Sequence, residues 1–72
     1  MVSYEEAVAV QRRIQDQIMA LPGVTGIAAK MRSGRPILEV SVDPAAEIPT
    51  ELTVDALDGV PLVVERRRYE IQ

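Results

Sequence analysis

The segment Leu21-Pro22-Gly23-Val24-Thr25-Gly26-Ile27 decides how this chain folds, because the hydrophobic pattern changes its period there. Before this segment, apolar residues recur every three or four positions, as on one face of an α-helix. After it they alternate with polar residues, as in a β-strand that has one face in the core. Pro22 cannot continue a helix, and Gly23 allows the chain to reverse. The sequence therefore predicts one helix followed by a sheet.

Residues 4–21 are predicted to form one amphipathic helix. Ser3 is suited to cap its first turn, and Glu6 lies three residues later, where it completes a capping box. The apolar face, which we expect to pack on the sheet, consists of Ala7, Val10, Ile14, Ile18 and Leu21. The polar face carries Gln11, Arg12, Gln15 and Asp16.

Two alternating runs, residues 24–32 and 37–43, flank Ser33-Gly34-Arg35-Pro36, which has the composition of a turn. This pattern predicts an antiparallel β-hairpin. In the second run, Leu38, Val40 and Val42 are expected to point inward, and Ile37, Glu39, Ser41 and Asp43 outward. In the first run, Thr25, Ile27, Ala29 and Met31 share one face, and Val24, Gly26, Ala28, Lys30 and Arg32 share the other.

A third strand is expected over residues 60–70, because Asp58-Gly59 is a turn signal and an apolar run follows it. Residues 53–57 fit either a short fourth strand or the continuation of a helical turn that starts at Pro49. The sequence leaves these two alternatives open.

These elements predict a single α+β domain over residues 1–72, in which one helix packs on a three- or four-stranded antiparallel sheet. A chain of this size buries only about 60% of its unfolded surface, so a partner surface would help to stabilise it. The sheet face without a helix would be apolar if it carried Val24 and Ile37, or Tyr69 and Ile71. A small protein tends to cover such a surface.

The composition excludes several classes of function. The chain has no Cys and no His, which removes disulfides and the usual ligands of zinc, copper and haem. The net charge of −3 and the two aromatic residues do not fit a nucleic-acid-binding surface. No apolar run is long enough for a membrane span, and no secretion signal stands at the N-terminus. We therefore expect a cytoplasmic protein without a cofactor, a nucleic-acid partner, a membrane partner or a small-molecule ligand.

No set of residues points to catalysis or to a metal site. Glu39 and Asp43 could form an acid–base pair, but they lie on the face expected to meet water, whereas a general acid needs burial. Serine nucleophiles lack a histidine partner. Four acidic residues could hold calcium, but their spacing is not that of an EF-hand, and a role in turns explains them better. They are Glu47, Glu51, Asp55 and Asp58.

Arg66-Arg67-Arg68 is the one cluster of like charge. Three arginines could bind phosphate or an acidic partner, but on a strand Arg67 points away from the other two. A guarded edge strand, or the rim of an interaction surface, is the simpler interpretation. The candidate interaction surface therefore comprises Val24, Ile37, Arg66, Arg68, Tyr69 and Ile71.

An ordered set of short motifs also resembles a known family. Leu21-Pro22-Gly23-Val24, Ile48-Pro49 and Gly59-Val60-Pro61 follow one another within residues 21–65. This order resembles small modules of the α-lytic protease prodomain-like fold, which occur as stand-alone bacterial proteins and before trypsin-like peptidase domains. The resemblance implies a two-layer α+β domain and, as in the prodomain relatives, binding to a protease domain.

Two functional hypotheses follow. In the first, the chain is a non-catalytic module that binds another protein, a peptidase above all, through an open sheet face or an edge strand. In the second, it is a structural homodimer that hides the same surface against its own copy.

Overall fold

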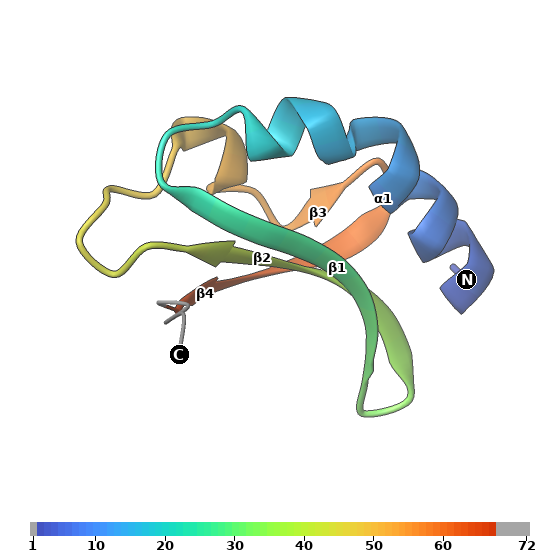
Figure 1. Cartoon of the computed structure of the whole chain (residues 1–72). Coiled ribbons are helices and arrows are strands. Elements are labelled where there is room, and N and C mark those ends of the chain that lie inside the picture. Colours follow the sequence, from blue (N-terminus) through green and yellow to red (C-terminus); the bar gives the residue numbers. More distant parts are fainter. Residues whose placement is uncertain (1, 68–72) are drawn as a thin grey trace, which may run out of the picture.

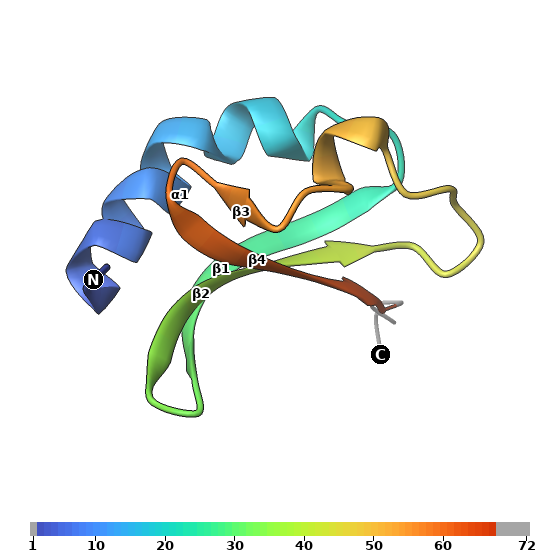
Figure 2. The same ribbon diagram turned by 180° about the vertical axis from the view of Figure 1, so that it is seen from behind.

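The computed structural model describes residues 2–67, in which one helix lies across one face of a four-stranded sheet (Figure 1). The elements in chain order are helix α1 (Tyr4–Met19), strands β1 (Val24–Arg32) and β2 (Arg35–Val42), a short 3₁₀ helix η1 (Thr50–Leu52), and strands β3 (Ala56–Leu57) and β4 (Val60–Arg66). Seen from behind, η1 lies on the same side of the sheet as α1 (Figure 2). The predicted two-layer α+β architecture is confirmed.

Helix α1 begins where the sequence predicts and ends two residues earlier. The Ser3 Oγ accepts a hydrogen bond from the Glu6 N–H at 3.1 Å, so the N-cap is formed. At the other end the Leu21 N–H donates to the Ile18 carbonyl at 3.1 Å, which tightens the last turn. Gly23 then adopts a φ of +82°, which starts the reversal into β1.

The hairpin turn is shorter than the four residues the composition suggests. Ser33 and Gly34 have φ values of 51° and 76°, which are typical of the two-residue type I′ turn that fits the twist of paired strands. Strand β2 therefore begins at Arg35 rather than at residue 37, and Arg32 pairs directly with Arg35.

The sheet is mixed, and the prediction of antiparallel pairing throughout was wrong. Its strand order is β1-β2-β4-β3; β1 pairs with β2 antiparallel, but β4 runs parallel to β2. The reason is the long connection over residues 43–59, which carries the chain back to the end of the sheet where β2 starts. Within this connection Pro49 precedes η1. Of the two alternatives for residues 53–57, the short strand is the one that forms, over Ala56–Leu57.

The core lies between the sheet and the two helical segments, in two clusters. One contains Ala7, Val10, Leu38 and Val60, and the other contains Ile18, Val40, Val42 and Leu52. Ile14 packs against both clusters and joins them. The inward positions predicted for β2 are therefore correct: all three side chains are fully buried.

Val24 lies on the opposite face from the one predicted. The register of β1 against β2 shifts between Val24 and Gly26, so Val24 pairs with Val42 and packs against the second cluster. A β-bulge at Thr25 is the physical cause, because one extra residue reverses the alternation of every position before it. A strict period of two does not anticipate such a bulge.

Candidate interaction surfaces

The residues predicted to form one interaction surface are not brought together. Val24 faces the core under the helix, whereas Ile37 lies on the open face of the sheet, as expected, with an exposure of only 6%. Arg66 is on the helix side at the end of β4. Arg68, Tyr69 and Ile71 lie outside the described residues.

The open face of the sheet is polar instead of apolar. Glu39 occupies its centre: its carboxylate pairs with Lys30 at 2.8 Å and lies 3.8 Å from an Arg67 guanidinium nitrogen. Arg67 also pairs with Glu65 at 2.6 Å. The buried residues of this face, Ile37 and Ser41, are next to these charged side chains in the strand register. This surface therefore does not need a covering protein to remove apolar area from water.

The chemistry of Glu39 is that of a stabilised anion. The hydrogen bond from Lys30 lowers the pKa of its carboxyl group below the ordinary value, and the charges of Lys30, Arg67 and Arg32 act in the same direction. Burial acts in the opposite direction and is outweighed. A general acid would need a raised pKa, so the environment of Glu39 disfavours that role.

The neighbouring arginines point to opposite sides of the sheet, as the strand alternation predicts. The Arg66 guanidinium donates to the carbonyls of Pro44 and Ala46, at 3.1 and 2.7 Å, and ties the end of β4 to the loop after β2. Arg67 lies on the open face with Glu39 and Glu65. The structure therefore gives Arg66 a role that its sequence context did not suggest.

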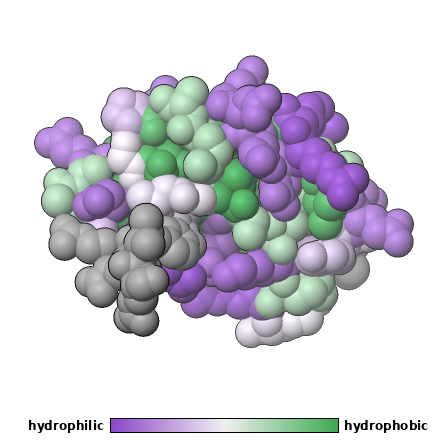
Figure 3. Space-filling view, in the orientation of Figure 1, coloured by the Kyte–Doolittle hydropathy of each residue, from purple (hydrophilic) through white to green (hydrophobic). Residues whose placement is uncertain are grey.

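At one edge of the sheet, along β1, a side chain of the helix occupies two backbone groups near the middle of the strand. The Gln11 amide oxygen accepts from the Ala29 N–H at 3.0 Å, and its nitrogen donates to the Ile27 carbonyl at 3.5 Å. A hydrophobic band follows β1 beneath the hydrophilic outer side of the helix (Figure 3). Periodicity predicts that Gln11 lies on the polar face of the helix, and it gives no signal of this edge contact.

The other edge, along β4, is open over most of its length. Strand β3 pairs only with Val60 and Pro61, and the last bond on this side runs from the Leu62 N–H to the Asp55 carbonyl at 2.9 Å. Backbone groups alternate between the two sides of a strand, so those of Val64 and Arg66 also point outward. Within residues 2–67 no backbone hydrogen bond reaches them.

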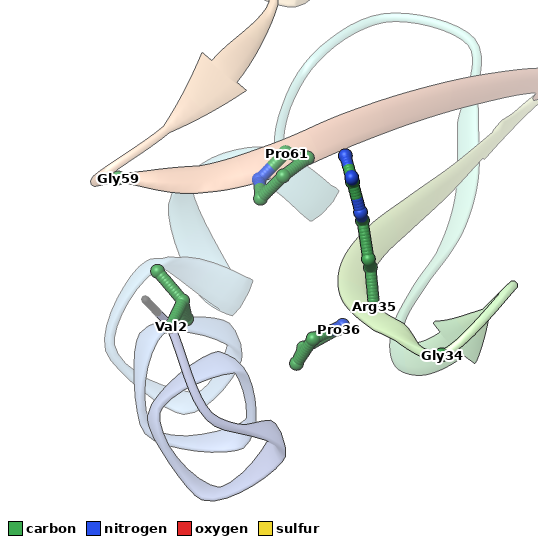
Figure 4. Close-up of a pocket in the computed structure, with 6 residues that line it drawn as sticks. All are labelled: Val2, Gly34, Arg35, Pro36, Gly59 and Pro61. Atoms are coloured by element: carbon green, nitrogen blue, oxygen red, sulfur yellow. The ribbon is translucent and has the colours of Figure 1, made fainter.

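The end of the hairpin forms a basic projection. Lys30 and the pair Arg32 and Arg35 occupy the open-face side of this end, and residues 30–35 are all exposed. A groove of about 280 Å³ lies beside it, lined by Val2, Gly34, Arg35, Pro36, Gly59 and Pro61. In Figure 4 the Arg35 side chain extends from β2 towards Pro61. The groove thus offers apolar contact and one guanidinium group.

The opposite end of the molecule is acidic. A shallow depression of about 400 Å³ is lined by Pro22, Glu47, Ile48, Pro49, Thr50 and Glu51. Two other acids of this connection have local roles: Asp43 accepts from the Ala45 N–H at 2.8 Å, and Asp58 pairs with Arg13 of the helix. Among residues 2–67 no group of three or more acidic side chains is placed to hold a metal ion.

Comparisons with known proteins identify no relative: no protein-family model, no curated protein and no solved structure matches this chain. The described part of the chain contains no helix that is long and apolar enough to cross a membrane. The function is therefore inferred from the geometry of the surfaces described above.

Proposed function

We propose that this chain is a non-catalytic protein-interaction module that binds an extended strand of another protein along the outer edge of β4. The observation that carries this proposal is the row of outward backbone groups at Val64 and Arg66, beyond the two residues that β3 covers. Such an edge is a template for main-chain pairing with a second chain.

The contrast between the two edges supports the same proposal. Gln11 occupies backbone groups of β1, whereas no side chain of residues 2–67 donates to or accepts from the backbone of Val64. Natural sheets usually protect their edges against pairing. The β4 edge, whose outward groups have no such partner, is therefore the better suited of the two to strand pairing.

The sequence suggests which kind of partner to test first and where in the cell the protein acts. The resemblance to prodomain-like modules makes a peptidase the first partner to test, and the default location is the cytoplasm. The polar open face and the lowered pKa of Glu39 fit a binding role better than acid–base catalysis.

A pair of variants at Arg66 tests the proposal. Arg66→Ala removes the guanidinium bonds to Pro44 and Ala46 but keeps the outward N–H, whereas Arg66→Pro removes both. The N–H of Arg66 faces away from β2, so proline costs no hydrogen bond between these strands. Affinity capture with each immobilised chain, quantified by mass spectrometry, should recover a partner with the wild type and with Arg66→Ala but not with Arg66→Pro.

Hydrogen exchange on the recovered complex locates the contact. Strand addition should slow the amides of Val64 and Arg66 and leave those of β1 unchanged. A partner that Arg66→Pro binds as well as Arg66→Ala does, or protection elsewhere, would rule out the β4 edge.

The same edge supports one alternative, a two-fold homodimer in which β4 pairs antiparallel with β4 of a second copy. Main-chain pairing of this kind should persist at high salt. The alternative predicts a dimer mass by light scattering for the wild type and a single-chain mass for Arg66→Pro. If the wild type had the mass of a single chain under these conditions, the homodimer alternative would be excluded.

A further inference from the structure

The hairpin end contains a pairing that sheets normally avoid. Arg32 and Arg35 face each other directly across the two strands, and like charges in this arrangement repel. Neither forms an ion pair or a side-chain hydrogen bond within residues 2–67. The type I′ turn at Ser33 and Gly34 fixes their backbone positions opposite each other, so one face of the hairpin end carries two positive charges. A carboxylate brought to this end would relieve the repulsion.

A surface of complementary chemistry exists on the same chain. The acidic depression has two exposed carboxylates, Glu47 and Glu51, beside the apolar side chains of Pro22, Ile48 and Pro49. Neither carboxylate is ion-paired within the described residues. The hairpin end, in turn, has Arg35 beside the apolar side chains of Val2, Pro36 and Pro61, which line the same groove. Each surface therefore combines charge with apolar contact, and their signs are opposite.

The two surfaces cannot meet within one molecule. In Figure 1 the hairpin end projects at the lower right, and the connection that carries the depression lies at the far left; the view from behind shows the same separation (Figures 1 and 2). Residues 43–58 contain five acidic residues and no basic one, whereas residues 30–35 contain three basic residues and no acidic one. The charges of these two segments are therefore opposite in sign and lie far apart.

We infer that the basic hairpin end of one copy binds in the acidic depression of a second copy, with Arg32 and Arg35 pairing with Glu47 and Glu51. The contact joins two different surfaces and is therefore heterologous, unlike a two-fold pairing of β4. Its charged residues are also different from the outward backbone groups of Val64 and Arg66 that form the strand-addition site. Because its charges are exposed, the contact should be weak and should depend on salt.

The mass of the chain in solution tests this inference. We would measure weight-average mass by sedimentation at protein concentrations up to about 1 mM, a range suited to weak contacts. Salt would be varied between about 0.01 M and about 1 M, over which the screening length falls from about 30 Å to about 3 Å. In low salt the mass should rise with concentration above the 7.9 kDa of one chain, and in high salt it should return to that value.

Charge exchange provides the decisive control. The variants R32E/R35E and E47K/E51K should each keep the single-chain mass in low salt, because each has two surfaces of like sign. Their equimolar mixture should associate, since the acidic hairpin end of the first fits the basic depression of the second. Recovery in the mixture also shows that both variants are folded. Arg66→Pro should associate as Arg66→Ala does, because both lose the guanidinium bonds to Pro44 and Ala46 and only the proline variant also loses the outward N–H. This comparison separates the contact from the β4 edge.

Three results would overturn the inference. In the first, the wild type keeps its single-chain mass at about 1 mM in low salt. In the second, the chain associates but high salt does not weaken the association. In the third, the mixture of the two variants does not associate. An association that Arg66→Ala keeps and Arg66→Pro abolishes would assign self-association to β4 instead.

Discussion

At the scale of single residues, Gly23 is a position where the fold requires glycine. Its φ of +82° belongs to the left-handed region, and a Cβ built there would lie 2.5 Å from the Cβ of Ala46. The Gly23 carbonyl also accepts from the Asp43 N–H at 2.8 Å. The joint between helix and sheet therefore packs against the loop that leaves β2, and both the conformation and the space require glycine.

Replacing Gly23 by Ala should destabilise the chain by about 2–4 kcal/mol, the sum of left-handed strain and overpacking against Ala46. Gly34→Ala is the matched control: Gly34 also has a positive φ, but nothing lies within 4 Å of its added Cβ. It should cost about 1–2 kcal/mol, from the strain alone. Urea unfolding of both variants measures the difference, and equal costs would show that Ala46 moves aside freely.

Glu39 makes stability depend on pH. Its pKa is lowered in the folded state, chiefly by the Lys30 hydrogen bond. The stabilisation it contributes is therefore complete above the ordinary pKa of glutamate, about 4.3. It is lost as the pH falls through the lower pKa of the folded state.

We expect the free energy of unfolding to fall below about pH 4 in the wild type and to fall less in Glu39→Gln. Near neutral pH the variant should be less stable by about 0.5–1 kcal/mol, because the lost pairs are partly exposed. Glu51→Gln, at an exposed carboxylate outside any ion pair of the described residues, is the control. If the free energy of unfolding changed with pH in the same way in the wild type and in Glu39→Gln, Glu39 would not be the source of the pH dependence.

At the scale of elements, the helix does more than cover the sheet. Through Gln11 it satisfies backbone groups of β1 that the sheet leaves unpaired, and through Arg13 it holds Asp58 in the turn between β3 and β4. The helix thus contacts the two outer strands of the sheet, at β1 and at the turn between β3 and β4. The occupied groups of the β1 edge are a consequence of where this single helix lies, whereas the β4 edge is open because β3 is only two residues long.

Replacing Gln11 by Leu should cost about 1 kcal/mol, because the Ala29 N–H loses its acceptor. Gln17 is exposed on the same helix and has no such contact, so Gln17→Leu should change stability by less than about 0.5 kcal/mol. Thermal unfolding compares the two, and hydrogen exchange should show faster exchange at Ala29 in Gln11→Leu only. If the Ala29 amide exchanged at the same rate in both variants, the edge would not depend on Gln11.

At the scale of the whole molecule, β2 is the centre of the structure. It pairs on both sides, with β1 and with β4, and Leu38, Val40 and Val42 are fully buried under the helical layer. The hairpin end and β3 are more peripheral: residues 30–35 are exposed, and β3 has two residues. Stability should therefore decrease outward from β2.

Native-state hydrogen exchange should reveal this gradient. We expect the slowest amides within β2, at rates that match global unfolding, and the fastest at the hairpin end and in β3. Slowest exchange in α1 or uniform rates along the sheet would contradict the central role of β2.

Local patterns anticipated most of the fold. The capped start of α1, the bounds of β1, the inward side chains of β2 and the helical turn after Pro49 all depend on neighbours in sequence, and all were predicted correctly. The candidate surface was anticipated less well. The bulge that turns Val24 inward, and the pairing of β4 parallel to β2, depend on contacts between distant segments. The prediction that Arg66 and Arg67 point to opposite faces was correct. The hydrogen bonds from Arg66 to the loop carbonyls could not be predicted from the sequence of the strand.

The sequence alone accounts for the elements and their apolar faces, because propensity, capping and periodicity act over a few residues. It also determined the separation of charge between residues 30–35 and 43–58. Only the tertiary structure decided how the long connection returns, which backbone groups Gln11 occupies and which edge β4 leaves open. It alone placed the basic and acidic surfaces at opposite ends. These features depend on where α1 and residues 43–59 come to rest on the sheet, and that position is set by packing across the whole core.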